Sequence, residues 1–147
     1  MDNLATTVWL RYLEACGEVL VFPSNAYKGA YIRDIVEQLV LQYKKQFCRP
    51  ASEVFADIPL DEPQGGDKEK HIDGLINKAK VLLGASDYQK LFDASLKDIL
   101  NDIKDDLNDF RVNFDEWFSE RSLFKTGFVE KTIERLKLSG HTYEQNG

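Results

Sequence analysis

Apolar residues recur at helical spacing through the first third of the chain. After Asp2, a candidate cap, they follow one broad face up to the stop at Gly17, at Leu4, Ala5, Val8, Trp9, Tyr12, Leu13 and Cys16. A second stripe runs from about Ala30 to Phe47 and consists of Ile32, Ile35, Val36, Leu39, Val40, Tyr43 and Phe47. Residues 1–47 are therefore predicted to form a helical N-terminal part, with an extended run and a turn between the two helices.

Helix breakers dominate the next stretch, residues 48–66. It contains Pro50, Pro59, Pro63 and the pair Gly65-Gly66, which interrupt helices and supply turn geometry. We expect these residues to form a long exposed loop.

Helical periodicity returns in residues 67–110. A helix beginning near Asp67 should close at Gly84 and carries His71, Ile72, Leu75, Ile76, Ala79, Leu82 and Leu83 on its apolar side. A longer helix should follow to about Asn108, with apolar residues at alternating three- and four-residue steps, at Phe92, Leu96, Ile99, Ile103, Leu107 and Phe110. Residues 67–110 are therefore predicted to be helical.

The period changes in residues 111–147. The stretch "VNFDEW" alternates as a short strand would, a helix from about Thr126 to Leu138 follows, and "HTYEQ" fits a second short strand. This strand–helix–strand order resembles a remnant of a βαβ unit. Asn146-Gly147 is typical of a type I′ hairpin turn, which needs a further strand, so we expect the sequence to be a piece of a longer protein. The predicted fold class is mainly α, with a few short strands near the C-terminus.

The charge and the cysteine content of the sequence argue against several classes of function. The 147 residues carry a formal charge of −6, which argues against a non-specific binder of DNA or of a membrane surface. No apolar run is long enough to cross a bilayer. Cys16 and Cys48 have no zinc-ligand spacing and follow no secretory leader, so we expect unpaired thiols and a cytoplasmic protein.

The acidic residues and histidines offer little catalytic chemistry. Asp98, Asp102, Asp105, Asp106 and Asp109 are spread along a helix, which favours a solvated face over a metal site or a basic partner. A second cluster of carboxylates near the C-terminus, at Asp115, Glu116 and Glu120, favours surface and capping roles over acid–base work. His71 and His141 lack other ligands at metal-binding spacing. The sequence also lacks a phosphate-binding glycine motif, so we predict no catalytic, cofactor-binding or metal residue.

Basic residues gather late in this acidic chain. The stretch from residue 120 to 137 contains five basic residues and three glutamates. They are Arg121, Lys125, Lys131, Arg135 and Lys137, and Glu120, Glu130 and Glu134. Two interpretations stay open. The basic residues could contact an RNA backbone locally, or they could form exposed helix pairs with the glutamates.

Three stretches resemble bacterial arginyl-tRNA synthetase, a class I aminoacyl-tRNA synthetase. They are "MDNLATTVWLRYLEACGE", "NAYKGAYIRDI" and "VNFDEWFSERSLFKTGFVEKTIERLKLSGHTYEQNG", and the pattern F-D-x-W-F-S-E-x-S-L in the third is specific. The stretch from about Cys48 to Leu107 lies outside the resemblance and looks like an insertion in the catalytic domain. Ala26 and Ala30 replace a glycine and an aspartate of the family pattern, so Tyr27 and Gly29 are assigned only loop geometry.

The resemblance implies an origin and an activity. The segment would be a helical subdomain excised from a Rossmann-like catalytic domain, between the two halves of its nucleotide-binding fold. The parent enzyme, an arginine–tRNA ligase, would activate arginine with ATP and Mg and transfer it to tRNA(Arg) in translation. The family's ATP signatures and arginine pocket are absent from this chain. It is therefore expected to bind no cofactor, to be inactive alone, and to need the remainder of the synthetase chain.

The resemblance also sharpens the candidate RNA contacts. Arg121, Lys125, Lys131 and Arg135 would be placed to border the path of the tRNA acceptor end. The alternative from another class is a free-standing helical adaptor that binds a protein through its long helix. A more distant alternative is an oligomer assembled through the apolar stripe of residues 92–110.

Overall fold

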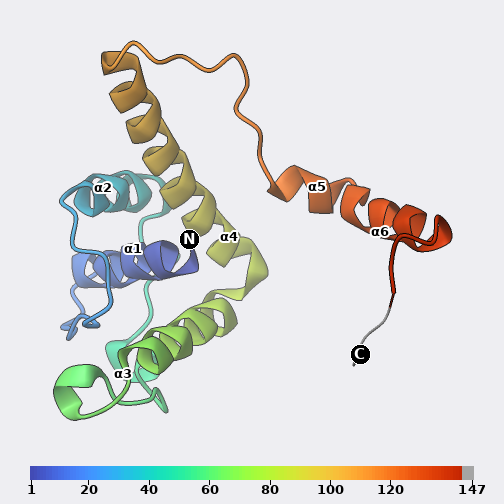
Figure 1. The fold of residues 1–147 in the computed structure, drawn as a ribbon. Coiled ribbons are helices and arrows are strands. Elements are labelled where there is room, and N and C mark those ends of the chain that lie inside the picture. The colour runs from blue at the N-terminus through green and yellow to red at the C-terminus, as the bar shows by residue number, and fades with distance from the viewer. Residues whose placement is uncertain (144–147) are drawn as a thin grey trace. The chain divides into compact units, whose positions relative to one another are not determined.

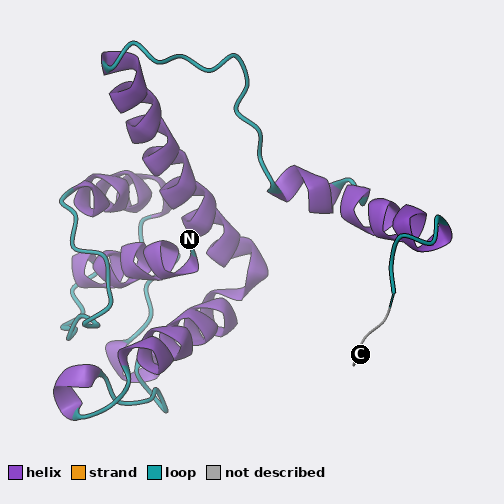
Figure 2. Ribbon diagram, in the orientation of Figure 1, coloured by secondary structure: helices purple, strands orange, loops and turns teal. Residues whose placement is uncertain are grey.

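The computed structural model describes residues 1–143, and in this range the secondary structure is entirely helical (Figures 1 and 2). The elements are α1 (Asp2–Ala15), α2 (Tyr31–Tyr43), α3 (Ala51–Val54), the 3-10 helix η1 (Glu62–Gln64), α4 (Lys68–Asp109), α5 (Arg121–Lys125) and α6 (Phe128–Leu138). The chain divides into two compact units, residues 1–107 and 108–147. None of the described helices is both long and apolar enough to cross a membrane.

Helix α1 is the centre of the first unit. Nine of its residues are buried, from Leu4 through Leu10 without interruption and then Tyr12 and Leu13. A helix that is buried nearly all round must have neighbours on several sides. Figure 1 shows α1 lying between α2 and the first half of α4. The stop predicted at Gly17 is present, since Gly17 has φ 100° and the Glu18 N–H bonds back to the Leu13 carbonyl at 3.0 Å.

Helix α2 is shorter than its apolar stripe predicts. It ends at Tyr43, because Lys44 adopts a positive φ of 54°. Tertiary contacts then hold the chain beyond the helix. The Tyr12 hydroxyl donates to the Lys44 carbonyl at 2.5 Å, and the Trp9 indole N–H donates to the Phe47 carbonyl at 2.9 Å. Phe47 is fully buried, so its place in the stripe reflects core packing rather than helix.

The connection between α2 and α4 contains two helical turns that its prolines did not predict. Most of its residues are exposed, but Val54 of α3 and Asp61 before η1 are buried. Asp61 and Gln64 form a capping box around η1. This connection therefore has defined structure at the points where it meets the core.

Helix α4 is interrupted at the predicted glycine. Gly84 has φ 72° and ψ 167°, a conformation that side chains other than hydrogen rarely tolerate. The Asp67 side chain caps the first half by accepting from the Glu69 and Lys70 N–H groups at 2.9 and 3.2 Å. The second half returns to the N-terminus, where the Tyr88 hydroxyl donates to Asp2 at 2.8 Å. Two predicted helices are thus joined through a sharp bend.

The second unit contains α5 and α6, which contact each other. The strand predicted at residues 112–117 is wrong, because this stretch is irregular. Residues 141–143 of the second predicted strand are also irregular, and the rest of that strand and the Asn146-Gly147 turn lie outside the described residues. A strand needs a hydrogen-bonding neighbour, and the described part of the chain supplies none.

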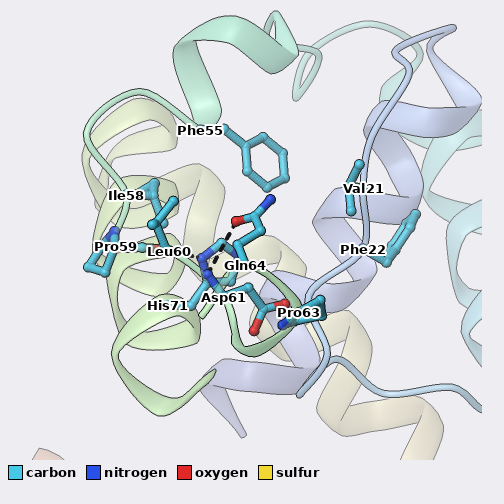
Figure 3. A pocket seen from close by; sticks show the side chains of 10 residues that line it. All are labelled: Val21, Phe22, Phe55, Ile58, Pro59, Leu60, Asp61, Pro63, Gln64 and His71. Carbon is cyan, nitrogen blue, oxygen red and sulfur yellow. Dashed lines mark hydrogen bonds between the residues drawn. The ribbon is translucent and has the colours of Figure 1, made fainter. Parts of the chain in front are cut away.

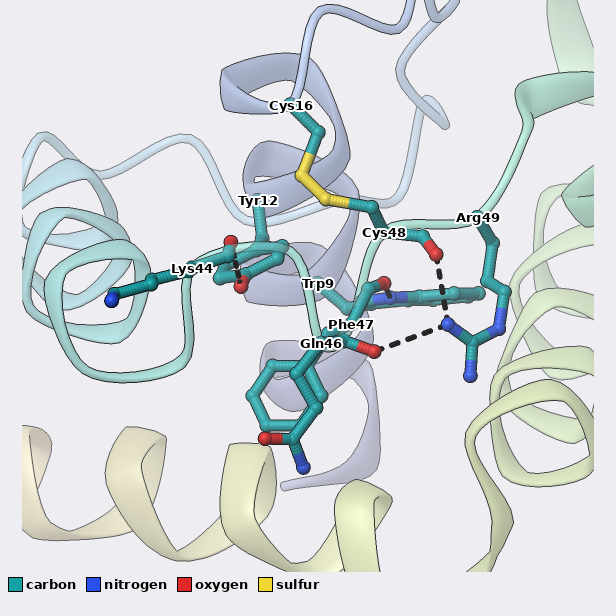
Figure 4. The surroundings of a disulfide bond; sticks show 8 residues. All are labelled: Trp9, Tyr12, Cys16, Lys44, Gln46, Phe47, Cys48 and Arg49. Atoms are coloured by element: carbon teal, nitrogen blue, oxygen red, sulfur yellow. Dashed lines mark hydrogen bonds between the residues drawn. A yellow bond between two sulfur atoms is a disulfide. The ribbon is translucent and has the colours of Figure 1, made fainter.

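The two cysteines are paired. A disulfide joins Cys16, at the end of α1, to Cys48, after α2 (Figure 4). The expectation of unpaired thiols is therefore wrong. The sequence separation of 32 residues carried no information that the fold would place the two side chains together.

Candidate functional sites

The first unit contains a small pocket, which we call the Asp61 pocket. Its volume is about 250 Å³, and it is lined by Val21, Phe22, Phe55, Ile58, Pro59, Leu60, Asp61, Pro63, Gln64 and His71. In the view of Figure 3, Val21 and Phe22 lie opposite Ile58 and Pro59, with the polar side chains between them. The pocket is smaller than usual sites for drug-sized ligands.

Asp61 organises the polar side of this pocket. Its carboxylate accepts from the Ser24 hydroxyl at 2.6 Å, the Ser24 N–H at 2.7 Å and the Glu62 N–H at 2.8 Å. Burial raises the pKa of Asp61, but these hydrogen bonds outweigh burial and hold the pKa below its usual value. The residue therefore ties the α1–α2 connection to η1 as an ionised carboxylate.

His71 is a structural histidine in this pocket. Its Nδ1 lies 2.6 Å from the Pro59 carbonyl oxygen. Since a carbonyl can only accept, Nδ1 carries a proton and donates. His71 and Asp61 are both buried, and each forms hydrogen bonds to the backbone or side chains of neighbouring loops. This arrangement holds the loops together, and it suits packing better than acid–base catalysis.

The acidic clusters of the sequence do not converge. Within residues 1–143, no three or more His, Cys, Asp or Glu side chains come together in a way that could hold a metal ion. Asp98 lies in the second half of α4, where burial and the nearby Asp102 and Asp34 raise its pKa. Glu120 takes the N-cap position of α5, but its side chain makes no capping hydrogen bond. Glu120 therefore lies at an exposed helix N-terminus, as expected, but its side chain does not cap the helix with a hydrogen bond.

The four candidate tRNA contacts lie on the two helices of the second unit. Arg121 and Lys125 are one turn apart on α5, and Lys131 and Arg135 are one turn apart on α6, so each pair shares a helical face. The turn between the helices is fixed by the Gly127 N–H, which bonds to the Phe124 carbonyl at 3.1 Å. The structure thus arranges these basic residues as two short rows.

Large apolar side chains accompany the basic rows. Residues 108–143 include no buried side chain, and their exposed apolar residues are Phe110, Val112, Phe114, Trp117, Phe118, Phe124, Phe128, Ile133, Leu136, Leu138 and Tyr143. Soluble monomers rarely expose so much apolar surface, and such surface commonly marks a site of interaction. Sequence reasoning assigned several of these residues to strands, and so it did not anticipate their exposure.

Comparison with known proteins shows which proteins the chain is related to. No protein-family model matches the sequence, and neither does a solved structure. However, all 147 residues align at 50% identity with the arginine–tRNA ligase of Legionella pneumophila strain Corby and with that of Thioalkalivibrio sulfidiphilus. The enzyme of Acinetobacter baylyi is 42% identical over 160 aligned positions. The chain is homologous to bacterial arginine–tRNA ligases.

The homology covers more of the chain than the recognised motifs do. It includes the stretch from Cys48 to Leu107, which resembled no family on its sequence alone. The chain spans about a quarter of the length of these curated arginine–tRNA ligases, 25% of the Legionella enzyme and 26% of the Acinetobacter enzyme.

Proposed function

We propose that this chain is a helical segment of an arginine–tRNA ligase catalytic domain. The supporting observation is 50% identity over the whole chain to enzymes of which it spans a quarter. In this proposal the segment lies between the two halves of a Rossmann-like nucleotide-binding fold, in a cytoplasmic enzyme of translation. Its partners are the remainder of the synthetase chain and tRNA(Arg).

The chemistry of the parent enzyme belongs to other segments. ATP with Mg and arginine would bind outside this segment, because its sequence lacks the ATP signatures and the arginine pocket of the family. The Asp61 pocket fits this assignment, since it offers neither a cluster of basic groups for phosphates nor a free carboxylate for a guanidinium. The purified 147-residue chain should show no aminoacylation and no ATP–pyrophosphate exchange above background. The intact synthetase containing this segment is the positive control, and turnover by the short chain would contradict the proposal.

The second unit would contact the rest of the synthetase through its apolar side chains. Phe110, Phe118 and Leu138 are 81%, 66% and 90% exposed, and burying such residues is worth about 1.5–3 kcal/mol each. A polar substitution such as Phe118→Ser should therefore destabilise the intact enzyme more than the short chain. Thermal unfolding of both proteins measures this difference, and equal effects would argue against the contact.

The basic rows would contact the phosphate backbone of the tRNA acceptor end. Charge reversal of Lys131 or Arg135 in the intact enzyme should raise the KM for tRNA about tenfold and leave the KM for ATP and arginine unchanged. Each change should also lower the salt dependence of tRNA binding by about one phosphate contact. Lys70→Glu, a charge reversal at an exposed position of α4, is the matched control. If Lys131→Glu and Lys70→Glu behave alike, the basic rows do not contact tRNA.

A further inference from the structure

The disulfide joins the end of α1 to the segment that follows α2. Cys16 is the C-cap residue of α1, and Cys48 follows the segment that leaves α2 (Figure 4). The same segment, which we call the 44–49 segment, includes the buried Phe47 and the partly buried Arg49. The Arg49 guanidinium donates to the Leu82 carbonyl at 3.1 and 3.2 Å, just before the bend of α4 at Gly84. The disulfide therefore joins the end of α1 to the segment that leaves α2, and the neighbouring Arg49 ties this segment to α4.

Non-covalent contacts hold the 44–49 segment independently of the disulfide. The Trp9 indole and the Tyr12 hydroxyl donate to carbonyls of this segment, and Phe47 packs against the ring of Tyr12 with centroids 5.5 Å apart. Arg49 also donates to the Cys48 carbonyl at 2.8 Å. These contacts keep Cys16 and Cys48 near each other, with Cα atoms 6.2 Å apart, whether or not the sulfur atoms are bonded.

A reversible disulfide must also be able to exchange with small thiols. Both cysteines are only partly buried, so a small thiol can approach from solvent. The sequence contains no other cysteine, and a reaction between these two therefore has no competing intramolecular partner. A proximate and accessible pair is the arrangement that reversible disulfides require.

We propose that Cys16 and Cys48 form a reversible thiol–disulfide switch that sets the local order of the 44–49 segment. The oxidant is a low-molecular-weight disulfide of the glutathione type. A thiolate of one cysteine attacks it, forms a mixed disulfide and releases one small thiolate. The thiolate of the second cysteine then displaces the other small thiolate. The two cysteines lose two electrons and two protons, and the small disulfide gains them as two thiols.

The oxidised and reduced chains should have the same fold, and they should differ mainly in how freely the 44–49 segment moves. Reduction removes the covalent tie but leaves the hydrogen bonds to Lys44 and Phe47 and the burial of Phe47. The first unit should therefore stay folded when reduced, with a melting temperature lower by about 5–15 °C. Opening of the 44–49 segment should become more frequent, and its amide hydrogens should exchange about tenfold faster or more.

Equilibration in glutathione buffers tests the switch directly. The purified chain is held at a series of ratios of reduced to oxidised glutathione and then alkylated, and the free thiols are counted by mass spectrometry. We expect a single two-electron transition within the range of these buffers. Two free thiols at every ratio, or a disulfide that no ratio reduces, would overturn the proposal.

Hydrogen exchange tests the conformational part. In peptides covering residues 44–49 the reduced chain should exchange faster than the oxidised chain, while peptides from α6 should not change. The double variant Cys16→Ser/Cys48→Ser should match the reduced chain at every glutathione ratio, and its circular dichroism checks that it folds. Equal exchange in the oxidised and reduced chains would show that the bond does not control this segment.

Discussion

The two units of this protein use apolar residues in opposite ways. Residues 1–107 contain a core of apolar side chains, of which the largest fully buried ones are Trp9, Tyr12 and Phe47. In residues 108–143 no side chain is buried, and Trp117 is 42% exposed. Both regions nevertheless carry amphipathic helices. The difference lies in the availability of a partner, since the first unit folds three long helical stretches against one another and the second has only α5 and α6.

The contrast between the two units shows that an apolar pattern can predict a helix without predicting that its apolar face is buried in a core. Apolar spacing on one face predicts a helix even when nothing covers that face, as it does for α6. Most helical stability nevertheless comes from packing, so helices of 5 and 11 residues depend on a surface to pack against. We therefore expect core substitutions to destabilise the first unit directly. On the proposal that the chain is a segment of a synthetase, substitutions in the second unit should destabilise mainly the longer protein.

The largest expected effect is at Trp9. Trp9→Ala removes a fully buried ring and leaves the Phe47 carbonyl without its donor, so it should destabilise the chain by about 3–5 kcal/mol. Trp117→Ala is the matched control in the second unit and should cost less than about 1 kcal/mol in the same chain. Urea unfolding followed by circular dichroism measures both. Equal costs would mean that the second unit has a core of its own.

Gly84 should show the next largest effect. A Cβ at this position meets no neighbour within 4 Å, so the cost of Gly84→Ala comes from the backbone conformation alone. At φ 72° and ψ 167° that cost is about 1–3 kcal/mol. Urea unfolding and near-ultraviolet circular dichroism should both report the change, because a straightened α4 would also separate Tyr88 from Asp2.

Gly74→Ala is the control for this substitution. Gly74 lies within the first half of α4, where alanine favours the helix, but its Cβ would come within 3.0 Å of the Pro59 side chain. The two effects oppose each other, so we expect a change below about 1 kcal/mol. A cost at Gly84 no larger than that at Gly74 would argue that the bend is not fixed by the glycine conformation.

These positions also show which features a sequence can predict. The stops at Gly17 and Gly84 were predicted because glycine has a local role that does not depend on distant residues. The end of α2 at Tyr43 was not predicted, because it depends on side chains of α1 that donate hydrogen bonds to the Lys44 and Phe47 carbonyls. Strands near the C-terminus were predicted from alternation alone, which is insufficient without a pairing partner.

The candidate sites show the same division. The capping box of Asp61 and Gln64 could have been found from its spacing of three residues, with Pro63 between them. The bond of Asp61 to Ser24, 37 positions away, and the pairing of Cys16 with Cys48 depend on tertiary structure. The resemblance to arginyl-tRNA synthetases came from specific sequence motifs and not from helical periodicity.

Asp61 gives a smaller effect with a defined pH dependence. Asp61→Asn should cost about 1–2 kcal/mol at pH 7, because it weakens three hydrogen bonds to a carboxylate. The pKa of Asp61 is lowered in the folded chain. The stabilisation is therefore fully present above the unfolded pKa of about 3.9, and it is lost as the pH falls through the lower folded pKa. Urea unfolding between pH 7 and pH 3 should show the two proteins converging in acid.

Asp98→Asn is the matched control with the opposite sign. The pKa of Asp98 is raised by burial and by the charges of Asp102 and Asp34, so its ionised form destabilises the fold at neutral pH. Removing the charge should leave stability unchanged or increase it at pH 7, and the difference should vanish as Asp98 becomes protonated in acid. Parallel pH profiles for the two variants would contradict the opposite shifts.

The smallest effect concerns aromatic pairs and compares the two units most directly. Tyr43 and Phe47 pack with centroids 4.8 Å apart in the first unit, and Phe114 meets Trp117 edge to face at 5.8 Å in the second. A double-mutant cycle to alanine should give a coupling of about 0.5–1.5 kcal/mol for the first pair. The second pair should give less than about 0.5 kcal/mol, because solvent competes for rings that are half exposed. Urea unfolding of the single and double variants supplies the free energies. A larger coupling for Phe114 and Trp117 in an intact synthetase would support the proposal that the longer protein covers this pair.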